Sequence, residues 1–468
     1  MKELSIQKIF IYIAAIFGIV FVVLTPPFQS PDEGNHFKKA YVMSEGHFFP
    51  QVVEGKEGFY LSESIEAYIS EQEKNVGKTD AKYTYTEILN EEKSARVYTD
   101  EVFTQFTAMS TNPVGHIIPM MGIIMGKIVA AIAGREPSIV MLLYFARMFC
   151  MIFYIACVAM AIKMTPILKR TFCILGLMPM SLFISSSVSY DGVLISVAFI
   201  FASLCFRLLF VESVYLSKYY IVSFGVIAFV FYTLKVVYLP LFLLLLFVPK
   251  EKYKDGRIIK RWLGIFAVFI VLILLFRIPT LFREEISVVS NTATNEQLIY
   301  VLENPLRYLQ IWYETVKEGR DFFVSSTVGV FGLVDTYLLS VMIYPYVFVL
   351  IVTGILEISG NNVKVKWYQR ISVLASIFIS VFGIFLAMYL LWTPLVEGGG
   401  VGANRINGVQ GRYFIPLLPV SFLCFGNSIL MRNKVIARLG EIVVNNSILV
   451  SVIMLIVSQL TMLLRFWI

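Results

Sequence analysis

The chain has 468 residues, of which 58% are hydrophobic and only 15% are charged, and its mean hydropathy is +0.76. Soluble domains contain about 25% charged residues, so this composition excludes a soluble globular protein. The net charge of +7 does not indicate nucleic-acid binding, because the Lys and Arg residues cluster in short loops between apolar runs. The sequence therefore predicts an all-α integral membrane protein with one polytopic domain over residues 1–468.

Eleven apolar segments are near the length needed to cross about 30 Å of hydrocarbon. They cover roughly residues 9–24, 139–162, 171–188, 192–211, 219–234, 236–249, 262–279, 337–356, 371–392, 413–430 and 447–465. The first segment follows Lys2 and Lys8 but has no small-x-small cleavage site after it. We therefore interpret it as a retained span rather than a signal peptide.

A further apolar run, residues 114–133, is ambiguous, and the charge of the loops decides between its two readings. If it does not cross and the N-terminus is cytoplasmic, every basic loop faces the cytoplasm; if it crosses, every one faces outside. The positive-inside bias favours the first arrangement. We therefore expect 114–133 to be a juxtamembrane or re-entrant helix, and the C-terminus to lie outside the cell membrane.

This threading places four features on the extracytoplasmic side. They are a long first loop with juxtamembrane helices at 25–138, a turn at Asp191, a loop at 280–325 and a Gly-rich loop at 393–412. Within 280–325, the apolar residues Leu306, Leu309, Tyr313 and Val316 have helical spacing, which predicts a helix along the membrane surface. No inverted pair of interrupted helices, typical of transporters, is visible.

The densest motif is TPPFQSPDEGNHF, residues 25–37, directly after the first span. Its adjacent carboxylates, Asp32 and Glu33, could act as a general base or bind a metal or sugar hydroxyls. Alternatively, the motif simply begins a short helix, with Ser30 as its cap and Pro31 at its first position.

Three single charges near the predicted outer surface each have two readings. Arg147 lies inside the second span, where an arginine is usually functional or paired but can also extend to the headgroups. Asp191 either contributes to a site or caps the helix that begins at Gly192. Lys235 separates two apolar runs, and it either binds a phosphate or is an ordinary interfacial lysine.

The loop EGGGVGANRINGVQGRYFIP, residues 397–416, has six glycines together with Arg405 and Arg412. It is not a Walker or dinucleotide-binding loop, because no GK[ST] is present and no strand precedes it. A Gly-rich loop with two arginines at a membrane surface could close over a diphosphate or a lipid phosphate. Plain flexibility is the alternative.

No metal site is predicted. The five cysteines fall within apolar runs, and the three histidines are too few and too scattered for a histidine cage. No cofactor is indicated with certainty, and a divalent cation stays open.

The segments PPFQSPDEGNHF, NPVGHIIP and VQGRYFIPLLP together resemble a bacterial family of polytopic membrane proteins of unknown function, DUF2142-like, over residues 9 to about 420. That family is similar in layout to fold-type-C glycosyltransferases (GT-C), which use lipid-phosphate-linked sugars. The resemblance implies an acidic active-site residue at Asp32 in the first outer loop, and a second carboxylate at Asp191. The sequence departs from many relatives in having Gly34 and Asn35 after the carboxylates.

We therefore expect a glycosyltransferase that moves a sugar from a polyprenyl-phosphate donor to an extracytoplasmic glycan acceptor. The alternatives are a polysaccharide polymerase or ligase that uses a lipid-diphosphate donor, and a transporter or flippase of lipid-linked saccharides. The candidate catalytic residues are Asp32 and Glu33; those for the donor phosphate are Arg147, Lys235, Arg405 and Arg412; and those for substrate binding are His36, Asp191, Gln410 and Tyr413.

Overall fold

The computed structural model describes residues 5–75, 77–98, 100–253, 258–281, 292–360, 365–425 and 434–468. Helices dominate these residues, and the short strands form two small antiparallel sheets. The all-α prediction is thus confirmed. Contacts divide the chain into unit 1, residues 1–207, 328–363 and 426–468, and unit 2, residues 208–327 and 364–425.

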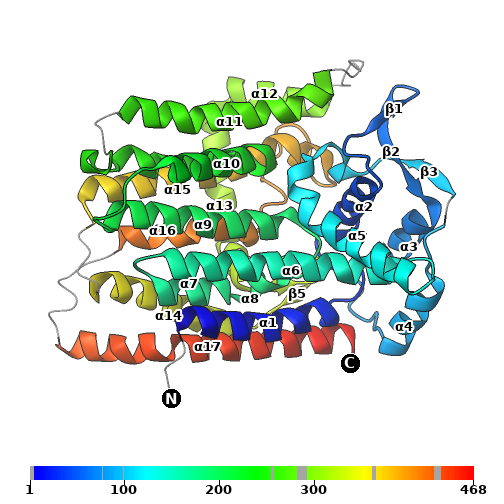
Figure 1. The fold of residues 1–468 in the computed structure, drawn as a ribbon, viewed down its shortest axis with the longest axis horizontal. Coiled ribbons are helices and arrows are strands. Elements are labelled where there is room, and N and C mark those ends of the chain that lie inside the picture. The colour runs from blue at the N-terminus through cyan, green and yellow to red at the C-terminus, as the bar shows by residue number, and fades with distance from the viewer. Residues whose placement is uncertain are drawn as a thin grey trace. The chain divides into compact units, whose positions relative to one another are not determined.

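Unit 1 contains most of the long helices and the segment 25–138 (Figure 1). Its α-helices are α1 (Ile6–Leu24), α2 (Glu33–Ser44), α3 (Glu63–Glu73), α4 (Tyr85–Ser94), α5 (Ile117–Ile132), α6 (Ile139–Met164), α7 (Lys169–Gly176), α8 (Pro179–Ser185), α9 (Tyr190–Phe210), α14 (Ser340–Gly360) and α17 (Lys434–Phe466). Short 3-10 helices are η1 (Thr107–Ser110) and η2 (Pro113–His116). The strands are β1 (Gln51–Val53), β2 (Lys56–Ser62) and β3 (Glu101–Thr104), paired in that order, and β4 (Val330–Phe331) with β5 (Thr336–Tyr337).

Unit 2 is built around a helical hairpin and a long partner helix. Its elements are α10 (Lys218–Lys235), η3 (Val236–Phe247), η4 (Lys250–Lys252), α11 (Ile258–Leu281), α12 (Thr292–Glu303), α13 (Pro305–Val328), α15 (Trp367–Leu391), η5 (Thr393–Leu395), η6 (Gly411–Leu417), α16 (Leu418–Ser421) and η7 (Phe422–Cys424). The ring of Phe231 lies 5.9 Å from that of Tyr238, and the ring of Phe224 lies 6.2 Å from that of Phe242. The chain therefore reverses at Lys235, between the two predicted segments 219–234 and 236–249.

Among the described residues, nine helical segments are long and apolar enough to cross a membrane. The predicted segment 171–188 is not one continuous helix, because Pro179 starts a new helix after α7 ends at Gly176. The predicted segment 413–430 consists of short helical turns up to Cys424, and 426–430 lies outside the described residues. In the predicted loop 280–325, residues 282–291 also lie outside them.

The first and last helices of unit 1 run side by side in the same direction (Figure 1). Gln459 Nε2 donates to the carbonyl of Phe17 at 2.8 Å, and Trp467 Nε1 donates to that of Leu24 at 2.9 Å. The later residue of α1 contacts the later residue of α17, so the two helices are parallel. The start of α1 and the end of α17 therefore lie at opposite ends of unit 1. An odd number of crossings requires this arrangement.

The segment 25–138 leaves and rejoins the helices of unit 1 at one end. Helix α6 runs antiparallel to α1, since Met151 packs against Gly18 whereas Arg147 reaches the carbonyls of Val22 and Thr25. Helix α5 in turn lies antiparallel to the first turns of α6, which extend beyond the end of α1. Although its length and composition would allow a crossing, α5 does not carry the chain to the other end.

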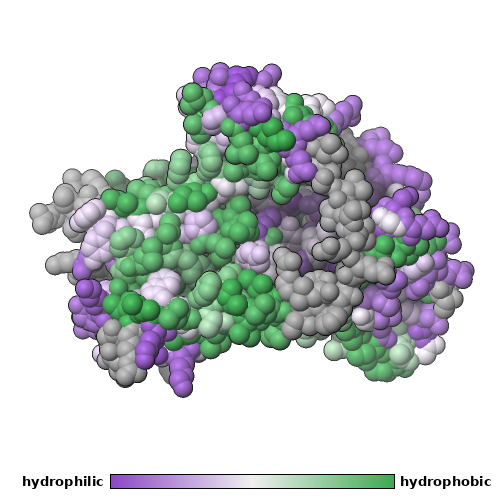
Figure 2. Space-filling model, turned by 90° about the horizontal axis from the view of Figure 1, so that it is seen from above, coloured by the Kyte–Doolittle hydropathy of each residue, from purple (hydrophilic) through white to green (hydrophobic). Residues whose placement is uncertain are grey.

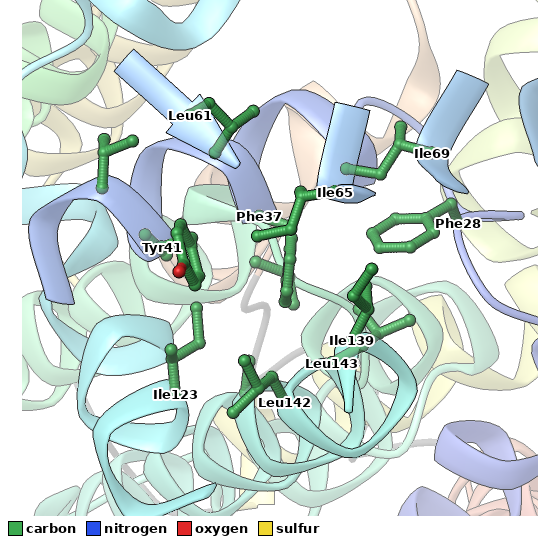
Figure 3. Close-up of a cluster of buried hydrophobic side chains, with 14 of the residues drawn as sticks. Phe28, Phe37, Tyr41, Leu61, Ile65, Ile69, Ile123, Ile139, Leu142 and Leu143 are labelled. Atoms are coloured by element: carbon green, nitrogen blue, oxygen red, sulfur yellow. The ribbon is translucent and has the colours of Figure 1, made fainter. Parts of the chain in front are cut away.

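Helix α2 forms the centre of the segment 25–138, and ten of its twelve residues are buried. Figure 3 shows Phe37 and Tyr41 of α2 surrounded by apolar side chains from β2, α3, α5 and α6. Its polar side chains are buried too, because no face of the helix is left to solvent: they include Glu33, His36, Lys38 and Lys39. The start of α2 is therefore held by packing on every side.

The predicted surface helix in 280–325 is present as α13. Tyr308 and Phe323, fifteen residues apart on α13, contact Phe382 and Phe385 of α15. The two helices therefore cross steeply. In the predicted apolar stripe, Leu306 is 80% and Tyr313 61% exposed, whereas Val316 is half-buried.

The surface character differs along the chain. Figure 2 shows mostly apolar side chains over the long helices, and mostly hydrophilic ones over the part of segment 25–138 at the right of both views. Helix α11, for example, exposes Leu263, Phe266 and Leu274 by more than half. Such surfaces are stable against hydrocarbon, which supports association with a lipid bilayer.

Candidate functional site

The motif after α1 contains two residues in the left-handed region of backbone space. Phe28 has φ 59° and Asp32 has φ 60°. Asp and Asn adopt this conformation more readily than most residues, but it still carries strain that the surrounding packing must hold. Asp32 occupies the N-cap position of α2, its side chain does not cap the helix, and it is exposed.

The alternative reading of this motif, with Ser30 as the helix cap and Pro31 at the first helical position, is wrong. The helix begins at Glu33, and Ser30 contributes only its carbonyl, which accepts the N–H of Glu33 at 3.2 Å. Because Asp32 is left-handed, the carboxylates of Asp32 and Glu33 lie in different environments. One is exposed and the other is completely buried.

The Glu33 carboxylate forms a two-pronged ion pair with Arg147 of α6. Arg147 Nε donates to Oε1 at 2.8 Å, and Nη2 donates to Oε2 at 2.6 Å. Oε1 also accepts the N–H of Val188 at 3.0 Å. Both charged side chains are 0% exposed. This is the geometry in which Arg and carboxylate groups bind each other most strongly.

The remaining N–H groups of Arg147 donate to the backbone where α1 ends. Nη1 reaches the carbonyls of Val22 and Thr25, and Nη2 that of Pro26, at 2.6–3.1 Å. All five N–H donors of the guanidinium are therefore engaged within the protein. The structure gives Arg147 and Glu33 a positioning function that joins α1, α2 and α6, and leaves no donor on Arg147 for the predicted phosphate contact.

The packing of α3 against α2 requires a small residue at position 34, directly after the two carboxylates. A Cβ atom at this position would lie 2.8 Å from Glu73 Oε1 and 2.8 Å from Ile69, so a side chain would push α3 away from α2. Burial raises the pKa of the Glu73 carboxyl, while Lys38 acts in the opposite direction. The close approach of α3 thus brings a further acid to the start of α2.

Two histidines from distant parts of unit 1 meet beside this motif. His36 Nδ1 lies 2.9 Å from His116 Nε2, and the ring of Tyr190 packs edge-on against His36 at 4.9 Å between centroids. Asp191 lies in the first turn of α9, so it does not cap a helix that begins at Gly192, and it is 9% exposed. We call Asp32, His36, His116, Tyr190 and Asp191 the α2 cluster.

His116 was missed as a candidate residue because its motif, NPVGHIIP, carries little information by itself. It ends η2, and Asn112 caps that short helix by accepting the N–H of Val114 at 3.0 Å. Eighty residues separate His116 from His36 in the chain. Only the packing of α2 against α5 reveals the pair.

In unit 2, three of the predicted residues meet at the tip of the α10–η3 hairpin. Lys235 Nζ lies 3.9 Å from the centre of the Tyr413 ring, and the guanidinium carbon of Arg412 lies 5.3 Å from it. The hydroxyl of Tyr238 holds the backbone by donating to the carbonyl of Tyr413 at 2.8 Å. We call Lys235, Arg412 and Tyr413 the Tyr413 cluster.

The residue before Arg412 locks this cluster onto α13. The N–H of Gly411 donates to Ser326 Oγ at 2.8 Å, and its carbonyl accepts from Thr327 Oγ1 at 3.1 Å. A Cβ on Gly411 would lie only 2.2 Å from the carbonyl oxygen of Phe323. Only glycine therefore fits here, and Arg412 is placed on a fixed backbone with 4% exposure.

The rest of the Gly-rich loop is fastened to its surroundings rather than free. Side chains accept its backbone N–H groups: Gln297 holds Gly402 at 2.8 Å and Thr315 holds Ile406 at 3.2 Å. Gln410 occupies the N-cap position of η6, next to the Tyr413 cluster in sequence. Arg405 lies in this loop and is exposed.

No group of three or more His, Cys, Asp or Glu side chains is placed to hold a metal ion within the described parts of the chain.

Comparison with known proteins gives one match. A family model described as "Predicted membrane protein (DUF2142)" covers residues 15–421, which is most of the chain. Neither the curated proteins nor the solved structures include a match. The motifs that carry the resemblance, from the start of α2 to η6, lie within the matched range. The chain therefore belongs to the DUF2142 family of predicted membrane proteins.

Proposed function

We propose that this protein is a membrane glycosyltransferase that moves a sugar from a polyprenyl-phosphate donor to an extracytoplasmic glycan. The observation that carries the proposal is the Tyr413 cluster, in which two cations gather on one aromatic ring. Lys and Arg side chains are the usual protein partners of a phosphate group, so two cations brought to one ring suit a lipid phosphate. The layout similarity of the family to GT-C enzymes supports the same chemistry.

The reaction is a single displacement. The acceptor hydroxyl attacks the anomeric carbon, and the bond from that carbon to the phosphate oxygen breaks with its electron pair left on the phosphate. Lys235 and Arg412 stabilise that negative charge, which develops in the transition state. Asp32 takes the proton of the acceptor hydroxyl as general base, because its carboxylate is exposed whereas that of Glu33 is bound to Arg147.

The orientation follows from the charges of unit 1. Lys163, Lys169 and Arg170 lie at the junction of α6 and α7, at the opposite end from segment 25–138. The positive-inside rule then puts that junction in the cytoplasm and the α2 cluster outside. A polyprenyl-phosphate sugar on the outer leaflet is the donor class suited to that side.

Two kinds of variant test the proposal in purified full-length protein, with a panel of radiolabelled polyprenyl-phosphate hexoses and pentoses as donors and extracted cell-envelope glycan as acceptor. Asp32→Asn keeps the shape and removes the charge, so transfer should fall by about 10²–10⁴-fold, the usual contribution of a placed base. Asp80→Asn, an exposed acid in the same segment, is the matched control and should transfer normally.

The Lys235→Ala, Arg412→Ala double variant should lose donor use while eluting as a folded monodisperse protein. Arg320→Ala, an exposed arginine of the same unit, is its control. Normal transfer by Asp32→Asn together with loss in the double variant would favour a polymerase with a lipid-diphosphate donor instead. Normal transfer by both Asp32→Asn and the double variant would exclude the proposed mechanism. It would favour a transporter or flippase of lipid-linked saccharides.

A further inference from the structure

The paired histidines of the α2 cluster have no part in the mechanism as stated so far. His116 is 0% exposed and His36 is 6% exposed, and their ring nitrogens lie 2.9 Å apart. A hydrogen bond between two buried imidazoles fixes the orientation of both rings. The bond can run from His36 Nδ1–H to His116 Nε2 or in the reverse direction, and the tautomers of the two rings set which one forms.

His36 is joined to Asp32 through the first turn of α2. The N–H of His36 donates to the carbonyl of Asp32 at 3.1 Å, so His36 follows the left-handed N-cap residue Asp32 by one turn. The Tyr190 ring closes the other side of the pair, 4.9 Å from His36 and 6.2 Å from His116 between centroids. Three elements, α2, η2 and α9, therefore converge on the two imidazoles.

Lys39 of α2 is a charged neighbour of His116, and the Tyr190 ring of α9 packs on both histidines. The other charged groups on the neighbouring elements are Asp32 at the N-cap of α2, Glu33 in its first turn, Arg147 of α6 and Asp191 of α9. Glu33 and Arg147 neutralise each other, and Lys39 donates to the carbonyls of Phe48 and Met109. Among the carboxylates at the start of α2, Asp32 is the exposed one.

A carboxylate alone is a poor final store for a proton at neutral pH, because its ordinary pKa is about 4, whereas that of histidine is about 6.5. A base that removes a proton in every turnover must pass it on. A histidine one helical turn away, held by a second histidine, supplies a suitable next acceptor.

We propose that His36 receives the acceptor's proton from Asp32 and that His116 is the positioning residue that orients the His36 ring, an inference that rests on the proposed glycosyl transfer. The acceptor O–H bond breaks as its oxygen bonds to the anomeric carbon. The phosphate leaves with the electron pair of the broken bond, and the proton passes through Asp32 to Nε2 of His36.

The loaded state requires one direction of the hydrogen bond between the two rings. Protonated His36 carries hydrogen on both ring nitrogens, and its Nδ1–H donates to Nε2 of His116. His116 then carries its own hydrogen on Nδ1 and is neutral, the form that complete burial favours. The proton leaves from His36 to water before the next turnover.

The activity test is a pH profile of sugar transfer by the full-length protein in nanodiscs, with the same donor panel. Wild-type kcat should fall on the acidic side as His36 stays protonated. His36→Gln should lower kcat by about 10²-fold and remove this acidic limb, with the KM for the donor within about twofold. His116→Phe should shift the limb, and His116→Gln, whose amide can accept from Nδ1, should restore most of it.

His47→Gln is the matched control, because His47 is the third histidine of the chain and is exposed just beyond α2. Its pH profile should equal that of wild type. A folded His36→Gln variant that keeps the wild-type acidic limb would overturn the relay and leave the glycosyl transfer standing. A wild-type protein that transfers no sugar from any donor would overturn both.

A second measurement does not depend on activity. In protein labelled with ¹⁵N in its histidine rings, His36 should gain a proton on acidification while His116 stays neutral with hydrogen on Nδ1. The His36→Gln, His116→Gln and His47→Gln spectra assign the three residues. If His36→Gln does not fold, the His116→Gln and His47→Gln spectra complete the assignment: protonation of His116 in place of His36 contradicts the proposal.

Discussion

The Glu33–Arg147 pair shows how the same residue types can serve structure rather than chemistry. Each charge is completely buried, and each finds its counter-charge and additional backbone partners. Removal of one member of such a pair leaves an uncompensated buried charge, which costs about 3–5 kcal/mol. The pair joins the end of α1 to the start of α2, so its loss should also displace Asp32.

We therefore predict that Arg147→Met lowers the apparent melting temperature in detergent by an amount equivalent to about 3–5 kcal/mol. The Arg147→Met, Glu33→Gln double variant should be less affected than the sum of the two single variants, because no unpaired charge remains. Differential scanning fluorimetry on the purified proteins measures this. Lys74→Met is the control: its exposed pair with Glu71 should contribute less than about 1 kcal/mol. Additive effects in the double variant would contradict the coupling.

At the scale of elements, the position of η6 depends on the close approach of Gly411 to the end of α13. The segment Gly411–Leu417 is apolar apart from Arg412 and is interrupted by Pro416, so its own helical propensity is weak. Ser326 and Thr327 at the end of α13 hold Gly411 from both sides. The position of Arg412 is thus set by the end of α13, and Ser326 and Gly411 are 85 residues apart in the chain.

Gly411→Ala should displace η6, because the added methyl group would overlap the backbone of α13 at 2.2–2.3 Å. Overpacking of this kind costs about 1–3 kcal/mol, and we expect lower thermal stability together with weaker use of the lipid-phosphate donor. Thermal unfolding and the donor titration measure the two effects. Gly360→Ala, where no atom lies within 4 Å of the added Cβ, should change neither. Unchanged donor use by Gly411→Ala would mean that Arg412 is not positioned in this way.

At the scale of the whole molecule, the direction of the helices in unit 1 constrains the topology. Segment 25–138 returns to the end from which it left, and the α6–α7 junction with its basic residues lies at the other end. The C-terminal end of α17 lies at the same end of unit 1 as segment 25–138, because Tyr83 of that segment donates its N–H to the carbonyl of Phe466 at 2.7 Å.

We predict that Asp80→Cys is labelled by a membrane-impermeant thiol reagent in intact cells. Lys163→Cys should be labelled only after permeabilisation, because positive-inside bias places it in the cytoplasm. Both positions are exposed, whereas the native cysteines are buried or half-buried, so the unsubstituted protein serves as the background. The reverse labelling pattern would invert the orientation and place the α2 cluster in the cytoplasm.

Residue patterns alone determined the membrane class, the approximate bounds of the apolar segments and the return of segment 25–138 to its starting side. These properties depend on hydropathy over about 20 neighbouring residues and on loop charge, both of which are local. The break before Pro179 was readable in principle, since proline starts a helix more readily than it continues one.

Only the tertiary structure decided which charges meet. Arg147 and Glu33 are 114 residues apart, His36 and His116 are 80 apart, and Lys235 and Tyr413 come from opposite sides of a long insertion. Nothing in the local sequence distinguishes an arginine that binds a substrate phosphate from one that saturates a buried carboxylate. The difference is which helix packs beside it, and in unit 1 that follows from the antiparallel contact of α6 with α1 and from the complete burial of α2.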